Sequence, residues 1–166
     1  MRMLDALIES QGPRLFGLCR KLCAARADAE DLYQETLLRA LEKQDRLAQV
    51  EDPGGYLARI CLNLYRDGLR RRKLLSFFSA SGEAGRAYLD AQAHAPPPDA
   101  GDEATVRWAV DGLPELYRQA VLLYYFYGQS VEQAAAALGV RPGTVKSRLS
   151  RARDMLKEVL GDGEPG

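Results

Sequence analysis

The chain has 166 residues, of which 46% are hydrophobic and 28% are charged. This composition is typical of one or two small globular domains and excludes a disordered chain. The formal net charge is zero, yet basic residues concentrate in segments 59–73 and 141–157, each with six basic residues against one acid. Because a polyanion responds to local patches of charge, the neutral total does not exclude a nucleic-acid partner.

The sequence contains no feature of an exported, membrane-spanning or catalytic protein. No apolar run approaches the roughly 20 residues that cross a bilayer, and acids interrupt the N-terminal segment 1–11 where a signal peptide needs an apolar core. Cys19, Cys23 and Cys61 are an odd number within helical patterns, so we expect small hydrophobes rather than disulfides or a metal site. No catalytic residue, cofactor, metal or small-molecule substrate is predicted, and the protein is expected in the cytoplasm.

The helical segment 28–43 has an apolar stripe that predicts burial and an opposite face that is acidic. The stripe consists of Ala29, Leu32, Tyr33, Thr36, Leu37 and Ala40. The opposite face carries Asp31, Gln34, Glu35 and Glu42, with Leu38 in their middle. A leucine surrounded by acids predicts the centre of a protein interface for a basic partner surface. A solvated face with an incidental leucine is the alternative.

The helical segment 56–73 carries the first basic patch. One side is lined by Leu57, Cys61, Leu64 and Gly68, and the other by Arg59, Asn63, Arg66 and Arg70. An arginine stripe interrupted by an asparagine predicts a phosphate track with one amide directed at a base. Tyr56 and Tyr65 are candidates for stacking on unpaired bases, although a place at the edge of the core suits Tyr65 equally well.

Residues 75–101 are rich in Ala, Ser, Gly and Pro, and three consecutive prolines at 96–98 predict an extended linker. Phe77 and Phe78 are unusual for a linker, and we expect them to pack back on a neighbouring domain because exposed aromatic rings are costly. No strand-like alternation persists anywhere in the sequence. The predicted fold is therefore all-α, with two small helical domains, 1–74 and 102–162, joined by a flexible linker.

The C-terminal part contains the signals of a helix-turn-helix unit. Ser130 and Gln133 form a predicted capping box, Gly139 suits the end of that helix, and Pro142 suits the first turn of the next. Two helices joined by so tight a turn are typical of a helix-turn-helix, although a hairpin that only packs is the alternative.

The second of these helices decides between the two interpretations. Its predicted buried stripe is Val145, Leu149, Ala152, Leu156 and Val159. The opposite face is small and polar with basic edges, and its predicted DNA contacts are Thr144, Lys146, Ser147, Arg148, Ser150 and Arg151. Small side chains allow close approach, serine can hydrogen-bond base edges, and acids occur on this face only later. The pattern predicts a recognition helix that enters the major groove by its N-terminus.

Three segments together resemble the extracytoplasmic-function sigma factors, which are two-domain bacterial transcription initiation factors. They are "DAEDLYQETLLRAL", "YLARICLNLYRDGLRRRK" and "LPELYRQAVLLYYFYGQSVEQAAAALGVRPGTVKSRLSRARDMLKE". The resemblance covers nearly the whole chain apart from the linker and the extreme termini. A helix-turn-helix alone is not specific, whereas the combination is.

The resemblance implies a role for each surface. It assigns Asp31, Gln34 and Glu35 to the clamp helices of the largest RNA polymerase subunit. It assigns Asn63 and the arginines after it to the minus-ten element, whose non-template strand is held melted, and loop 50–56 to the capture of an extruded base. It assigns the exposed face of the recognition helix to the minus-35 element, and the linker to a path through the polymerase. The family often has Trp where this chain has Tyr56.

We therefore interpret the chain as an alternative sigma factor that binds core RNA polymerase, directs it to promoter DNA and assists promoter melting. The resemblance also makes an anti-sigma factor a plausible partner, which could hold the protein at the membrane until it acts on the nucleoid. One rival is a stand-alone helix-turn-helix regulator with a helical dimerisation domain, which the acidic face around Leu38 argues against. Another is a polymerase-binding protein that reads no sequence, which the serine-centred face argues against.

Overall fold

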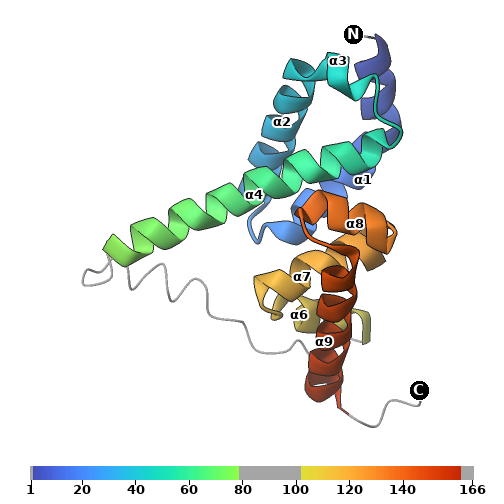
Figure 1. Cartoon of the computed structure of the whole chain (residues 1–166). Helices are drawn as coiled ribbons and strands as arrows, with labels where there is room; N and C mark the ends of the chain where they lie inside the picture. The colour runs from blue at the N-terminus through green and yellow to red at the C-terminus, as the bar shows by residue number, and fades with distance from the viewer. Residues whose placement is uncertain (1, 79–101, 162–166) are drawn as a thin grey trace.

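All regular structure in the described part of the chain is helical (Figure 1). The computed structural model describes residues 2–78 and 102–161. The N-terminal group comprises α1 (Arg2–Leu22), α2 (Arg26–Glu42), α3 (Gln44–Leu47) and α4 (Pro53–Phe78). The C-terminal group comprises α6 (Asp102–Asp111), α7 (Glu115–Val121), the π-helical turn η1 (Leu122–Phe126), α8 (Val131–Leu138) and α9 (Pro142–Leu160). The all-α prediction is confirmed, while most of the predicted linker, including its three prolines, lies outside the described residues.

A leucine-rich core holds α1, α2 and α4 together. Leu18 of α1 and Leu57 of α4 are among its fully buried side chains. The buried residues of α2 are Ala29, Leu32, Thr36 and Ala40, as predicted, and Tyr33 and Leu37 are half-buried beside them. The hydroxyl of Thr36 donates to the Leu32 carbonyl at 2.7 Å, so this polar group is satisfied inside the core. The acidic face of α2 is thereby turned outward.

Helix α4 is longer than the predicted basic helix, and its second half runs away from the body of the N-terminal group (Figure 1). It continues to Phe78 because residues 70–78 contain no glycine or proline that would end it. The expectation that Phe77 and Phe78 pack back on a domain is wrong, since their side chains are 76% and 73% exposed. A straight helix carries both rings past the core that would have covered them.

The helix-turn-helix elements form as the sequence predicts. Ser130 Oγ accepts from the Gln133 N–H at 3.0 Å, and Gln133 Oε1 accepts from the Ser130 N–H at 2.8 Å. Gly139 ends α8 with φ 71°, in the left-handed region that favours glycine, and Pro142 is the first residue of α9. These caps fix where the two helices begin and end.

The buried stripe of α9 is shorter than predicted. Val145, Leu149 and Ala152 are buried, but Leu156 is only half-buried and Val159 is 52% exposed. The prediction for Val159 is wrong because α9, with 19 residues, is longer than each of the helices α6, α7 and α8 on which it packs. Its N-terminal half is therefore the firmly anchored part.

The three cysteines are free thiols. Cys19 and Cys61 are buried with their Sγ atoms 3.7 Å apart, and this contact together with burial raises the pKa of Cys61. Burial raises the pKa of Cys23 to about 11. Within residues 2–78 and 102–161, no cluster of His, Cys, Asp and Glu is placed to hold a metal ion, and no helix is both long and apolar enough to cross a bilayer.

Candidate nucleic-acid and protein interfaces

The outward face of α9 is the first candidate DNA-binding surface. Four of its predicted contact residues are exposed: Lys146, Ser147, Ser150 and Arg151. The other two, Thr144 and Arg148, are half-buried. The serines lie between longer cationic side chains, so a partner can approach the helix closely at the serines while the cations reach around it. This shape and charge suit a duplex groove lined by phosphates.

The stripe on α4 is the second candidate DNA-binding surface. Arg59, Asn63 and Arg70 are exposed, and Arg70 forms a surface ion pair with Asp67 that holds it only weakly. Arg66 is half-buried, and its Nη1 donates to the carbonyl oxygen of Leu138 at 2.9 Å. The structure thus leaves three of the four predicted residues exposed to a ligand and engages the fourth with the C-terminal group.

A cationic hollow lies at the start of this stripe. Its volume is about 150 Å³, and its walls are Lys43, Arg46, Tyr56, Arg59, Ile60 and Asn63. The Tyr56 ring and the apolar Ile60 side chain suit a nucleobase, and the cations suit the phosphates that flank it. Of loop 50–56, which the resemblance assigned to base capture, only Tyr56 lines this hollow.

Sequence reasoning missed Lys43 and Arg46. The acids Glu42 and Asp45 alternate with them along the chain, so no basic patch is visible at this point in the sequence. Lys43, between α2 and α3, and Arg46 of α3 lie beside α4, and the turn that places them there has no clear signal in the pattern of apolar residues.

The outer face of α2 is the candidate protein interface. Leu38 is 60% exposed, and Asp31, Gln34 and Glu35 around it are exposed as well. Leu41, at 37% exposed, enlarges the apolar centre. Apolar side chains ringed by carboxylates suit a partner with an apolar centre and a basic rim.

A buried arginine joins the two helical groups. Arg118 of α7 is 6% exposed and pairs with Glu115 at 2.7 Å. Its guanidinium also donates to the Tyr65 hydroxyl and to the carbonyl oxygens of Lys21 and Leu22, at 2.8 and 3.0 Å, at the C-terminal end of α1. A cation is favourable at that end of a helix dipole. Burial lowers the pKa of Arg118, but Tyr65 and Glu115 raise it further, so the guanidinium stays charged.

Tyr65, which the sequence offered for base stacking, is 7% exposed and part of this junction. Its hydroxyl donates to Glu115 Oε1 at 3.0 Å. Burial raises the pKa of Tyr65, so the hydroxyl remains a donor at neutral pH. In this arrangement Tyr65 lies at the edge of the core, which was the alternative to base stacking.

A second junction is built around Tyr127, which is 1% exposed. Its hydroxyl donates to the Gly54 carbonyl at 2.9 Å, and the Arg14 guanidinium lies 3.8 Å from the centre of its ring. Arg14 Nε also donates to the Tyr127 carbonyl at 2.8 Å. Nearby, Gln133 Nε2 donates to Asp52 Oδ2 at 2.9 Å. The C-terminal group therefore contacts loop 50–56 directly.

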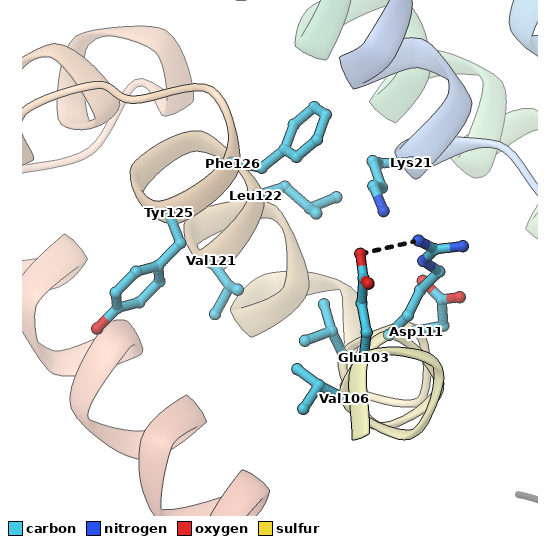
Figure 2. Close-up of a pocket in the computed structure, with 10 residues that line it drawn as sticks. Lys21, Glu103, Val106, Asp111, Val121, Leu122, Tyr125 and Phe126 are labelled. Atoms are coloured by element: carbon cyan, nitrogen blue, oxygen red, sulfur yellow. Dashed lines mark ion pairs between the residues drawn. The ribbon is translucent and has the colours of Figure 1, made fainter. Parts of the chain in front are cut away.

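The Arg118 and Tyr127 junctions belong to one contact between the two helical groups, which we call the docked interface. The ring of Phe126 in this interface faces α1. Lys21 Nζ lies 5.3 Å from the centre of the ring, and a Cβ added to Gly17 would meet the ring at 3.2 Å. Figure 2 shows Lys21 and Phe126 at the rim of a hollow of about 240 Å³ next to α6. Its walls are largely apolar, and the Glu103 carboxylate on its border pairs with Arg107 at 3.9 Å rather than pointing at a common centre. The hollow therefore has no site chemistry of its own.

Comparison with known proteins places both helical groups in one superfamily. Residues 7–74 match the model of sigma-70 region 2, and residues 105–156 match that of sigma-70 region 4. The chain is 36% identical over 157 residues to the ECF RNA polymerase sigma factor EcfG of Rhodopseudomonas palustris, covering 94% of this chain and 83% of that protein. It is 35% identical over 164 residues to the ECF RNA polymerase sigma factor SigE of Mycolicibacterium smegmatis, but spans only 61% of its length.

A solved structure is similar over almost the whole chain. It is the sigma factor RpoE of Bartonella quintana in complex with the anti-sigma factor NepR, with a TM-score of 0.79 and 29% sequence identity. The similarity covers 99% of this chain and 100% of that one. Both candidate DNA-binding surfaces and the acidic face of α2 lie within the matched segments.

Proposed function

The chain belongs to the extracytoplasmic-function sigma factors of the sigma-70 family, and from this membership we propose how its surfaces divide the work of transcription initiation. As an alternative sigma factor, it binds core RNA polymerase in the bacterial cytoplasm, directs it to two-part promoters and assists melting of the start region. This function needs no catalytic residue. A factor that binds melted DNA more tightly than duplex shifts the opening equilibrium by that difference in affinity.

The observation that carries the proposal is that one chain presents two separate surfaces with DNA-binding chemistry. On α9, Ser147 and Ser150 read base edges of the upstream element while Lys146 and Arg151 reach bases or phosphates beside them. Thr144 and Arg148 lie at the half-buried margin of this face and contact the adjoining sugar-phosphate backbone of the DNA. The duplex contacts the N-terminal half of α9, which is the half that Val145 and Leu149 anchor in the core.

The α4 stripe holds the minus-ten segment. Arg59, Arg66 and Arg70 follow the phosphates, and Asn63 is directed at a base. The hollow beside Tyr56 takes an extruded base, with Lys43 and Arg46 on its phosphates, because Tyr56 and Ile60 suit the base and the cations complement the phosphates. Holding one base outside the stack favours the melted strand over the duplex.

The acidic face of α2 binds core RNA polymerase. Leu38 forms the apolar centre of that contact, and Asp31, Gln34 and Glu35 form its polar border. An anti-sigma factor is a second partner. The complex of the Bartonella quintana relative with NepR supports it, because that protein shares this chain's fold over its full length.

Run-off transcription on a library of genomic fragments tests the function. Core RNA polymerase alone is compared with core plus this chain, and with core plus a variant carrying Lys146→Gln and Arg151→Gln. We expect new, discrete start sites that share a two-part upstream sequence with the wild-type chain, and their loss with the variant although it still binds core. No new starts, combined with DNA binding in the absence of polymerase, would instead identify a stand-alone regulator.

A further inference from the structure

The free end of α4 presents large apolar side chains that the described residues leave uncovered. Leu74, Leu75, Phe77 and Phe78 are 57%, 67%, 76% and 73% exposed. The two aromatic rings meet edge to face with their centres 5.7 Å apart, so Phe78 supports the ring of Phe77. Leu74, Phe77 and Phe78 fall within about 100° of one another around the helix, and an exposed apolar patch of this kind indicates a binding surface.

Helical register places Phe77 on the DNA-binding stripe. It follows Arg59 by 18 residues, which is five turns at 3.6 residues per turn, so the two side chains leave α4 on the same side about 27 Å apart. Asn63, Arg66 and Arg70 occupy the turns between them. Leu75 departs by about 160° from this direction, on the opposite side of the helix.

The charge next to the patch identifies its occupant. Residues 70–73 are four consecutive basic side chains, all of them exposed. They attract a polyanion, and exposed aromatic rings beside such a track stack on unpaired bases irrespective of sequence. We propose that Phe77 stacks on an unpaired base of the promoter strand held by α4, so that the stripe continues to the end of the helix. This inference rests on the proposed function.

Site-specific photo-crosslinking in the promoter complex tests the contact. A photoreactive benzoylphenylalanine replaces Phe77 in the full chain, and the same group at Leu75 is the matched control because it lies across the same helix end. In complexes of core RNA polymerase, chain and a promoter mapped by run-off, we expect a crosslink to DNA from position 77 and little or none from position 75. A crosslink from position 77 to a polymerase subunit or to the chain itself overturns the inference.

A functional measurement accompanies the crosslink. Loss of one stacked base by alanine substitution corresponds to about a tenfold weaker complex, so Phe77→Ala is expected to shorten the lifetime of the open complex by that factor while Leu75→Ala leaves it unchanged. Equal lifetimes for the two variants contradict the inference. The proposed function itself fails only when the wild-type chain produces no promoter-dependent starts, so the two failures are distinguishable.

A different observation carries a second inference, because the docked C-terminal group covers part of the minus-ten surface. Arg66 of the stripe is engaged by Leu138 of α8. Asp52 and Gly54, which flank the start of α4, are engaged by Gln133 and Tyr127. A strand that follows the stripe past Arg66 and reaches loop 50–56 must displace α8.

Hydrogen bonds and apolar packing hold the docked interface, but it also contains unfavourable contacts. Gln129 lies in this interface, because its Nε2 is 3.2 Å from the position of a Cβ added to Gly55. Among the described residues, its side chain has both amide atoms buried without a hydrogen-bond partner, and an unpaired buried amide destabilises the state that contains it. Burial lowers the pKa of Arg148, and the positive charge of Arg66 lowers it further. These two cations, one from each helical group, therefore repel each other in the docked state. We infer that docking is a reversible, self-inhibited state in which the helix-turn-helix group blocks the minus-ten surface until polymerase and promoter separate the two groups.

A wedge variant tests this inference. A side chain at Gly17 meets the Phe126 ring across the interface, whereas a side chain at Gly68 meets nothing within 4 Å. Both glycines lie in helices, so Gly17→Gln and Gly68→Gln gain similar helix propensity. The radius of gyration of the full chain is measured by small-angle X-ray scattering. Affinity is measured for a single-stranded oligonucleotide that carries the minus-ten segment of a mapped promoter.

We expect Gly17→Gln to increase both the radius and the affinity, and Gly68→Gln to change neither. Tyr127→Phe, which removes only the hydroxyl donated to Gly54, is expected to act in the same direction more weakly. An unchanged radius and affinity in Gly17→Gln contradicts the inference, as does a larger radius without tighter binding. Polymerase-dependent starts in run-off assays test the proposed function independently of either result.

Discussion

Replacing Ser147 and Ser150 by leucine is expected to abolish recognition of the upstream promoter element while leaving the fold intact. Both side chains are exposed, and the buried anchors of α9 lie on its other side; exposed substitutions usually change stability by no more than about 0.5 kcal/mol. Each serine hydrogen bond to a base contributes about 1 kcal/mol, or about fivefold in binding, so the pair accounts for about 30-fold. The longer leucine side chains add to this loss because they hold the helix away from the groove.

The assay is the initial run-off rate on two promoters, one intact and one with a scrambled upstream element. With the wild-type chain the ratio of the two rates is expected to be large, and with the double variant it is expected to approach one. Glu158→Leu is the matched control, because it places leucine on the same face about 12 Å further along α9. A double variant that keeps the wild-type ratio of rates refutes the assignment of α9 as the recognition helix. An equal fall of this ratio in Glu158→Leu refutes the proposal that α9 enters the major groove by its N-terminal end.

Three further predictions concern the acidic face, the α8 cap and the docked interface. Asp31→Lys combined with Glu35→Lys is expected to weaken binding to core RNA polymerase at least tenfold at low salt, and less at high salt, because a favourable charge pairing becomes a repulsion. Glu30→Lys is the control in the same titration, because the Glu30 carboxylate pairs with Arg26 instead. Equal losses in the two variants would contradict the assignment of the acidic face to polymerase. Ser130→Ala is expected to lower the free energy of unfolding by about 1 kcal/mol in urea titrations, because it removes one half of the capping box; an unchanged midpoint and slope would show that the cap contributes nothing. Burial raises the pKa of Tyr127 to about 12, whereas an exposed tyrosine titrates at about 10. The contribution of the neutral Tyr127 hydroxyl to docking is therefore complete below pH 10 and is lost as pH rises toward 12. The radius of gyration should grow in that window, and by less in Tyr127→Phe.

Features that depend on a few neighbouring residues could be predicted from the sequence. The caps at Ser130, Gly139 and Pro142 form as expected because each satisfies backbone groups within its own turn. The exposure of Leu38 follows from the register of α2, since a stripe of apolar residues fixes which side of a helix is buried. The exposed positions on α9 follow in the same way.

Features that depend on distant residues could not be predicted. Arg14 and Tyr127 are 113 residues apart, and Arg118 reaches carbonyls that belong to α1. No periodicity records such a contact, and a run of four aromatic residues at 124–127 indicates only that they cannot all face one small core. The error at Phe77 has a similar origin, because a preference for burial says nothing about whether a surface lies within reach. Within residues 2–78 and 102–161, no such surface covers the projecting half of α4, where Phe77 and Phe78 are exposed.

The zero net charge has a physical consequence for how this chain finds promoters. Its basic surfaces attract DNA, but the acidic face of α2 repels the same phosphates, so the chain alone gains little from long-range attraction to DNA. If core RNA polymerase binds the acidic face, as we propose, it covers that face and removes the repulsion. In the inferred self-inhibited state, separation of the two helical groups then frees Arg66 for the minus-ten strand. Both steps increase DNA affinity only after polymerase is bound, so the salt dependence of DNA binding should be steeper for the holoenzyme than for the sum of core and free chain.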